Sequence, residues 1–290
     1  MSALKKGARR AARHVALDGL SAISKATGRL ESAMARPRVH FVYLHDLPPT
    51  DEEALRGLVR RLVRTHTLIT YSEAVDRVNR GHIDRPFVSF SFDDGFLSNL
   101  RAARILEEYG TTGCFFIPTG FVGTSTVAEA RAYFKTKQGV NEPAMTWDDL
   151  GSLKSRGHEI GSHTVSHSNL ALVSPQRVVD EIEESNEILS SHFGSCDHFA
   201  WPLGRFSQFS PQAARVAYNA GHTSCASAER GAHTDIADGG LVGLCIRREH
   251  VLASWPLRHA LYFMAKSSAN AGPDSNAWPT SLGGRDEQAS

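Results

Sequence analysis

Two adjacent aspartates and a pair of histidines are the residues of this sequence best suited to catalysis or metal binding. Asp93 and Asp94 directly follow an apolar run, and His163 and His167 lie four positions apart. Neutral imidazoles at this spacing can reach one ion if the segment turns helically, and one carboxylate completes a His-His-Asp set with open positions for water and substrate. Either pair alone is also typical of a solvated turn or a hydrogen-bonded loop. Together they predict a metal site.

The elements that must position these residues follow from the local sequence pattern. Apolar residues alternate with serines through residues 87–92, which predicts a buried strand that ends at the aspartates. Gly95 permits a tight turn, and the apolar spacing after it predicts a helix that ends near Gly110. A short strand at 159–160 precedes the histidines. Both pairs should therefore lie at the carboxyl ends of strands.

Strands alternate with capped helices along the rest of the chain. Helix starts are predicted at Thr50, Thr146, Ser174 and Ser210. The alternation argues for a parallel α/β fold of barrel type, in which active sites gather at the carboxyl ends of the strands. The long stretch 119–144 has no clear period, and we expect a substrate-binding or lid loop there. Tyr133, Phe134 and Lys135 could contact a sugar from this loop.

Two short segments carry a family resemblance. The sequences SFDDG at Ser91–Gly95 and HTVSH at His163–His167 resemble the first two signature motifs of the polysaccharide deacetylases. These are the enzymes of carbohydrate esterase family 4, which have a nodulation-type deacetylase domain. The resemblance covers about Val39–Phe263 and includes Val42–Asp46 as the opening strand. It implies an irregular, incomplete (β/α) barrel in a single domain.

The resemblance also implies a reaction, the metal-assisted hydrolysis of an acetamide. It assigns one divalent ion, with zinc as the expected metal, to three ligands: Asp94, His163 and His167. Asp93 would then be the general base toward the metal-bound water that acts as nucleophile. The backbone N–H of Leu203 would stabilise the oxyanion, which requires no particular side chain. His250 or a water molecule would protonate the departing amine.

The third motif of the family departs from its usual pattern here. Ala200 stands where the family has an arginine that pairs with the catalytic aspartate, and Leu203 replaces a tyrosine. Loss of the arginine removes a partner that would hold the pKa of the aspartate down. Arg205 is close in sequence and could substitute for it. We therefore expect a diverged active-site wall and, with it, a diverged substrate.

The last motif is also matched weakly. His250 comes one residue later than the family's histidine, so a surface histidine remains the alternative to a general acid. The aspartate that usually tunes this histidine cannot be placed, although Asp235 and Asp238 are nearby in the sequence. His45, at the end of the first predicted strand, could line the same pocket or be structural.

The charges and the composition set the domain boundaries and the partners. The basic arm, residues 1–38, carries nine Lys and Arg against two acids, or +7, which leaves −6 for the rest of the chain. A net charge of +1 argues against nucleic-acid binding. The catalytic domain is expected at 39–265, and the composition of residues 266–290 predicts a disordered tail. The four scattered cysteines are expected to be reduced core residues rather than a zinc cluster.

The N-terminal arm also indicates where in the cell the protein is expected. Asp18 and Gly19 interrupt its only apolar stretch, so it does not resemble a signal peptide, and no run of about 20 apolar residues occurs. We expect a cytoplasmic protein, with the arm either a solvated leader or an amphipathic helix that contacts an anionic inner-membrane surface.

The expected substrate is an N-acetylated amino sugar of a bacterial polysaccharide or its precursor. This would make the protein part of cell-surface polysaccharide biosynthesis. Two alternatives remain open. One is a small-molecule amide or imide hydrolase of the same fold, and the other is a non-catalytic glycan-binding homologue. The departures in the third and last motifs favour the latter, whereas the intact aspartates and histidines oppose it.

Overall fold

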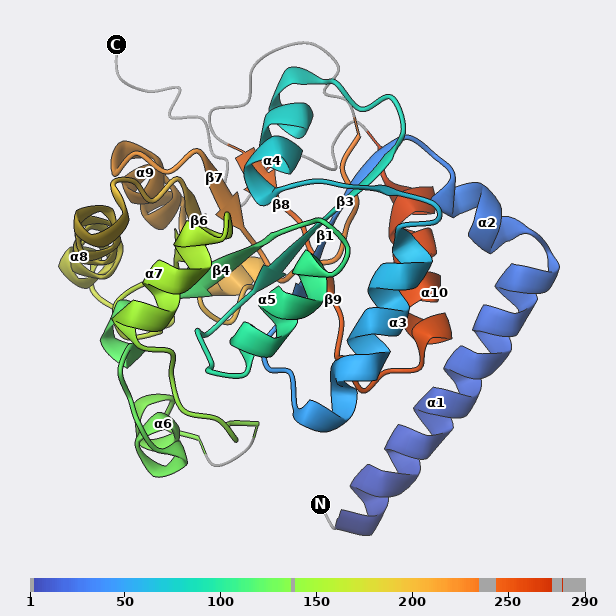
Figure 1. Cartoon of the computed structure of the whole chain (residues 1–290), viewed down its shortest axis with the longest axis horizontal. Helices are drawn as coiled ribbons and strands as arrows, with labels where there is room; N and C mark the ends of the chain where they lie inside the picture. The colour runs from blue at the N-terminus through green and yellow to red at the C-terminus, as the bar shows by residue number, and fades with distance from the viewer. Residues whose placement is uncertain (1–2, 137–138, 235–243, 273–277, 279–290) are drawn as a thin grey trace.

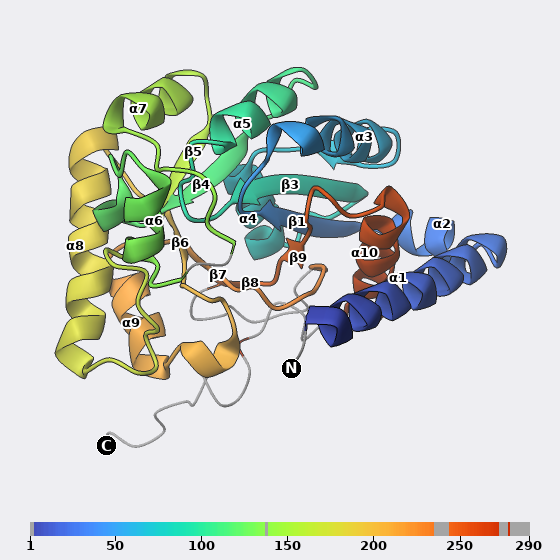
Figure 2. The same cartoon turned by 90° about the horizontal axis from the view of Figure 1, so that it is seen from below.

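The fold is a curled parallel sheet surrounded by helices (Figures 1 and 2). The computed structural model describes residues 3–136, 139–234, 244–272 and 278. The strands are β1 Arg38–Leu44, β2 Thr67–Leu68, β3 Pro86–Phe92, β4 Gly113–Ile117, β5 Glu159–Ser162, β6 His198–Ala200, β7 Ser224–Ala226, β8 Leu244–Ile246 and β9 Glu249–His250. The α-helices are α1 Ala3–Ala26, α2 Arg29–Met34, α3 Glu52–Leu62, α4 Tyr71–Arg80, α5 Asn99–Glu107, α6 Val127–Tyr133, α7 Trp147–Ser155, α8 Pro175–Phe193, α9 Pro211–Asn219 and α10 Leu257–Asn270. Three short 3₁₀ turns are η1 Pro49–Asp51, η2 Thr119–Phe121 and η3 Phe206–Gln208.

The strand order is β8-β7-β6-β5-β4-β3-β1-β9, with β2 paired to β3. All of these strand pairs are parallel. Strands β8 and β9 are separated in sequence only by Arg247 and Arg248, yet β8 pairs with β7 at one edge and β9 with β1 at the other. One short segment therefore spans both edges of the curled sheet, and the ladder is interrupted where it crosses. This is the irregular, incomplete barrel expected from the sequence.

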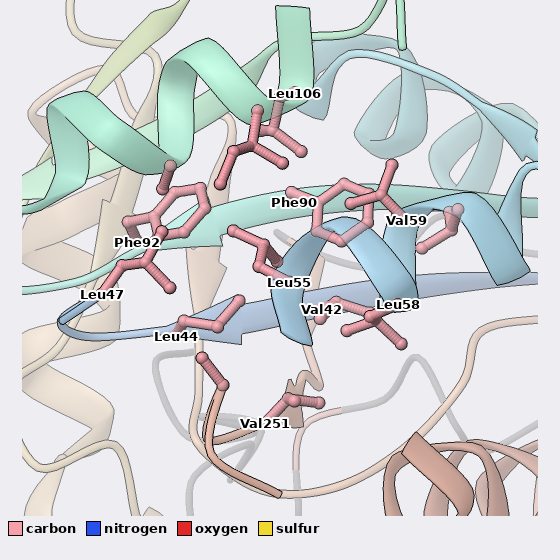
Figure 3. Packing of buried hydrophobic residues seen from close by; sticks show 14 of the residues in the cluster. Val42, Leu44, Leu47, Leu55, Leu58, Val59, Phe90, Phe92, Leu106 and Val251 are labelled. Carbon is pink, nitrogen blue, oxygen red and sulfur yellow. The ribbon is translucent and has the colours of Figure 1, made fainter. Parts of the chain in front are cut away.

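The main hydrophobic core lies between the outer face of the sheet and the surrounding helices. Figure 3 shows side chains of β1 and β3, such as Val42 and Phe90, packed against Leu55 and Val59 of α3. These side chains are at most 1% exposed, because the alternation along each strand places every second residue in this layer. The inner face is filled differently, by Phe41 and other apolar residues together with α4, which contacts β1, β3 and β8. The candidate site lies at the end of the sheet where the strands finish.

Three of the four predicted helix starts are confirmed. Thr146, Ser174 and Ser210 each accept a hydrogen bond from the backbone N–H three residues later. Thr50 is wrong as an N-cap, because α3 begins at Glu52 after a 3₁₀ turn and Thr50 bonds to Asp51 instead. The four cysteines are all buried with free thiols.

The expected loop 119–144 is more regular than its sequence pattern suggested. It contains the turn η2 and the helix α6, which begins at a capping box formed by Thr126 and Glu129. The signal was present in the sequence as a threonine followed three residues later by a glutamate. Only residues 137–138 of this stretch lie outside the described residues.

The described helices nearest to the two ends of the chain pack together, α1 and α2 with α10. In the expected arm, residues 1–38, α1 is helical, and α2 buries Leu30 and Met34 in the main core. Helix α10 extends to Asn270, past the expected start of the tail at 266. Most of the remaining tail lies outside the described residues. Among the described residues, no helix combines the length and the apolar character needed to cross a bilayer.

Candidate active site

The predicted site residues meet in one cavity of about 650 Å³ at the carboxyl ends of the strands. Its lining includes all six of them: Asp93, Asp94, His163, His167, Leu203 and His250. Four of the five non-glycine residues with positive φ among those described also line this cavity or belong to its histidine segment: Asp94, Thr164, His167 and Leu203. Backbone strain of this kind concentrates where surrounding structure fixes a functional geometry.

The three predicted metal ligands converge. Oδ1 of Asp94 lies 3.5 Å from Nε2 of His163 and 3.3 Å from Nε2 of His167. One ligand atom from each side chain falls within 4.8 Å of the others. Oδ1 of Asp94 is buried without a hydrogen-bond partner among the described residues. A carboxylate and two imidazoles that face one another without bonding fit a divalent cation.

The orientation of His163 supports this reading. Its Nδ1 lies 2.6 Å from the carbonyl oxygen of Ala200. Because a carbonyl oxygen can only accept, Nδ1 carries the proton and Nε2 presents a lone pair toward Asp94.

The segment that carries the histidines is not helical, so the two rings do not meet through the helical turn that their spacing would allow. Thr164 has φ 67° and His167 has φ 55°, and the chain loops back so that both rings reach the same point. Gly161 begins this path inside β5, where a Cβ would lie 2.7 Å from the ring of Phe116. The strand therefore requires glycine there to approach its neighbour.

Neighbouring elements hold the histidine segment in place. The carboxylate of Glu181, on α8, is fully buried and accepts hydrogen bonds from the backbone N–H groups of Val165 (2.9 Å) and Ser166 (2.8 Å). On the other side, Gly120 and the hydroxyl of Tyr133 donate to the carbonyl oxygen of Val165. The expected role of Tyr133 as a sugar contact is therefore not what the structure shows, because its hydroxyl anchors the histidine segment.

Asp93 faces a buried arginine that the sequence analysis did not identify. Arg248 donates from Nη1 to Oδ1 of Asp93 (2.7 Å) and from Nη2 to Oδ2 (2.8 Å). Arg248 also donates from Nε to the carbonyl oxygen of Ser227, and its guanidinium lies over the ring of Tyr43. Burial raises the pKa of Asp93, but the charge of Arg248 and its hydrogen bonds outweigh it and lower this pKa. Asp93 is thus an ionised carboxylate.

Arg248 corrects the expectation that the aspartate lacks an arginine partner. Arg248 comes from the two-residue link between β8 and β9 rather than from the position of Ala200. Arg205, the suggested substitute, is solvent-exposed and caps a 3₁₀ turn through its backbone. The available signal was a pair of arginines between two short β-type stretches, but nothing local showed which of them turns inward.

His250 lies on the cavity wall beside two other rings. It stacks on Tyr43 with 4.9 Å between ring centroids and meets His45 edge-on at 5.3 Å. Its Nε2 is buried without a hydrogen-bond partner among the described residues. Burial lowers the pKa of His250 to about 3, so it is neutral near pH 7. Asp235 and Asp238, considered as tuning residues, lie outside the described residues.

The remaining wall is largely apolar. Leu203 has φ 65°, and its side chain is 51% exposed at the cavity edge near Leu252. Phe134 also lines the cavity and packs edge-on against His167, as expected of a residue near the substrate. Lys135 is not part of the lining. The apolar wall faces a polar floor of carboxylates and imidazoles.

Comparisons with known proteins agree with this geometry. A 24% identical relative over 140 residues is described as "Putative polysaccharide deacetylase YxkH" of Bacillus subtilis (strain 168). That match covers 47% of this chain and 44% of the relative, so it spans less than half the length of that protein.

Solved structures share the fold over most of their length. The Streptococcus pyogenes deacetylase PplD in complex with acetate has a TM-score of 0.61 and 17% identity, covering 78% of this chain and 98% of that one. IcaB from Ammonifex degensii has a TM-score of 0.61 and 20% identity, covering 79% and 98%. The sequence model of the family described as polysaccharide deacetylase matches residues 80–224, half of the 290 residues. The chain therefore belongs to the polysaccharide deacetylase family.

Proposed function

We propose that this protein is a metal-dependent hydrolase that removes N-acetyl groups from an amino sugar of a bacterial polysaccharide or its precursor. One observation carries the proposal: Asp94, His163 and His167 converge around an unpartnered carboxylate oxygen, beside an Asp93 that is held ionised by Arg248. The proposal is supported by the presence, in one cavity, of side chains that could bind a cation and a carboxylate that could act as a base. Membership of the deacetylase family supports the same reaction class.

Asp94, His163 and His167 would hold one divalent ion, which we expect to be zinc. When bound, such an ion would polarise the amide carbonyl and lower the pKa of a water molecule toward about 7. Residues of the protein would carry out the proton transfers and would stabilise the oxyanion.

Asp93 would accept the proton of the attacking water. Its two oxygens already receive one hydrogen bond each from Arg248, which fixes the plane of the carboxylate and leaves a second lone pair on each oxygen. The lowered pKa keeps Asp93 ionised, and therefore competent as a base, across the neutral range.

Two further groups would act on the product side of the reaction. The backbone N–H of Leu203 has no acceptor among the described residues, and we assign it to the oxyanion. His250, or a water molecule next to it, would protonate the departing amine. Because His250 is neutral near pH 7, it would first have to receive the proton that Asp93 removed.

The experiment that tests this proposal combines metal content with acetate release. The purified protein and its His163→Ala variant would be analysed for bound metal and supplied with N-acetylated sugars. We expect near-stoichiometric metal and metal-dependent acetate in the wild-type protein, and neither in the variant. His82→Ala, a change at an exposed histidine away from the cavity, is the matched control and should retain both.

The other outcomes separate the alternatives. Metal without acetate, together with hydrolysis of a small cyclic imide or amide, would replace the sugar deacetylase by a small-molecule hydrolase. A chain that binds no metal after reconstitution, yet binds glycan, would be a non-catalytic homologue, and the proposal would be abandoned.

A further inference from the structure

Helix α1 docks on the barrel through its polar side. Asp18 accepts hydrogen bonds from Nε of Arg258 and Nε2 of His259, both at 2.6 Å, and both donors belong to the start of α10. Ser21 donates to the carbonyl oxygen of Arg258 at 3.3 Å. These contacts fix which side of α1 faces the rest of the molecule. In a typical surface helix the apolar side would take this position.

The opposite side of α1 carries apolar residues into solvent. Val15 is 70% exposed, Leu20 46% and Ile23 60%, which makes them three of the most exposed large apolar side chains described. At 100° per residue they fall within one arc of the helix. The other positions of this arc from residue 12 onward are all small and exposed: Ala12, Ala16, Gly19 and Ala26. The apolar side of this amphipathic helix therefore faces solvent, and its polar side faces the barrel.

The positive charge of α1 is concentrated in the N-terminal half of the helix. Its first half contains five basic residues, Lys5, Lys6, Arg9, Arg10 and Arg13. The first acidic residue is Asp18, and its carboxylate is already bonded to α10. A dense positive charge therefore precedes an apolar, solvent-facing arc.

We propose that α1 binds the surface of an anionic lipid membrane, with the arc of Val15, Leu20 and Ile23 inserted among the acyl chains. Lipid phosphates would pair with the basic first half of the helix, and the acyl layer would cover the apolar arc. A second copy of α1 would offer an apolar partner but no free negative charge, because Asp18 is engaged. A lipid surface meets both requirements at once.

The position of α1 relative to the cavity connects membrane binding to the proposed reaction. In Figure 1 the first turns of α1 lie on the lower side of the molecule, as does α6, and Phe134 just after α6 lines the cavity. Figure 2 views this side face-on, with the start of α1 toward the viewer. A membrane against the first turns of α1 would therefore lie on the side of the molecule that carries α6. If the proposed deacetylase function holds, the substrate class that fits is an amino sugar carried on a lipid.

The test is flotation of the full-length protein with vesicles. Vesicles of phosphatidylglycerol and phosphatidylcholine would be compared with vesicles of phosphatidylcholine alone, at low and high salt. We expect binding only to the anionic vesicles. The triple variant Val15→Ser, Leu20→Ser, Ile23→Ser should bind on the order of 100-fold more weakly, because about 1 kcal/mol of apolar burial is lost at each position. Leu172→Ser is the matched control and should bind normally, because Leu172 is 81% exposed but does not belong to α1.

A second variant tests the charge separately. Changing Lys5, Lys6, Arg9 and Arg10 to Gln should weaken binding by on the order of 1000-fold at low salt, because each basic residue near the surface contributes about 1 kcal/mol. Light scattering of both variants, with circular dichroism to show retained helix, would reveal a dimer through this face. A dimer lost in the triple variant, or equal binding by the variants and the wild type, would overturn the proposal. Acetate release from a soluble sugar should be unchanged in all of them, so a failure of membrane binding is distinct from a failure of the deacetylase function.

Discussion

The two sides of the cavity are built in different ways. On the side of the proposed metal site, Asp94, His163 and His167 come from two short contiguous motifs at the ends of β3 and β5. On the side of the proposed proton transfers, Asp93 depends on Arg248, which is 155 positions away in the sequence, and His250 follows from the same closing segment. The first side is set by local sequence, and the second by how the barrel closes. A local motif can therefore be intact while its partner has moved to another strand.

The largest effects should separate the two adjacent aspartates. Asp94→Ala should lose bound metal and should lower kcat/KM on the order of 1000-fold, because Lewis-acid assistance disappears. Asp93→Asn should keep the metal and still lose about 100-fold to 10,000-fold, because only the base is removed. Metal analysis and acetate release on both variants check this. An active Asp93→Asn enzyme would show that the base is elsewhere.

The next largest effect on activity is expected from the proposed general acid, His250. His250→Gln should reduce kcat/KM on the order of 100-fold for a sugar amide. The loss should shrink for a substrate whose departing amine is weakly basic, since such a leaving group needs less protonation. Parallel kinetics on an N-acetylated sugar and an acetanilide would show the difference. An equal loss on both substrates would make His250 a structural residue of the cavity wall.

Removing the displaced arginine should have a smaller effect on turnover but a large one on stability. In Arg248→Met, Asp93 remains buried without its partner, so the free energy of unfolding should fall by about 3–5 kcal/mol near pH 7. Burial then acts alone and raises the pKa of Asp93, so the acid limb of kcat/KM should move to higher pH. In the wild-type protein this pKa is lowered, so the stability that the pair contributes is present above the ordinary aspartate pKa of about 3.9 and is lost as the pH falls below it.

Two further variants sharpen the test of Arg248. Denaturant titrations at several pH values should show the Arg248→Met defect shrinking as the pH drops, because a protonated Asp93 no longer carries a buried charge. Arg205→Met should leave both stability and the pH profile unchanged, because Arg205 is exposed. The double change Ala200→Arg, Arg248→Ala would ask whether an arginine at the family's usual position restores the profile. If the acid limb of kcat/KM did not shift in Arg248→Met, the proposed role of the Asp93–Arg248 pair would be refuted.

The smallest effect is expected from the support of the histidine segment. Glu181→Gln keeps the shape of the side chain but replaces one of its two oxygens, of which Oε2 accepts from both Val165 and Ser166. Metal affinity should fall about tenfold, with kcat nearly unchanged once metal is saturating. Glu184→Gln, on the exposed side of the same helix, is the control and should have no effect. Metal titration by calorimetry would measure both, and an unchanged affinity in Glu181→Gln would show that the segment is rigid without it.

Much of the fold followed from local patterns. Helix starts with a side-chain acceptor and an apolar stripe were predicted correctly at Thr146, Ser174 and Ser210, because a cap is a contact within one turn. Thr50 failed because the proline before it favours a 3₁₀ turn, which moves the helix start to Glu52. The helix α6 was missed because its capping box was outweighed by the surrounding glycines.

The candidate site divides in the same way. Local sequence was enough to predict the Asp93–Asp94 pair at the end of one strand and a histidine pair after another, because period-two alternation and a turn glycine are local properties of the chain. The three-dimensional fold was needed to show which arginine holds Asp93, that Tyr133 anchors a loop, and that α1 turns its apolar side outward. These features depend on the direction in which each side chain points once distant strands are paired, and that direction is fixed by the closure of the barrel rather than by neighbours in sequence.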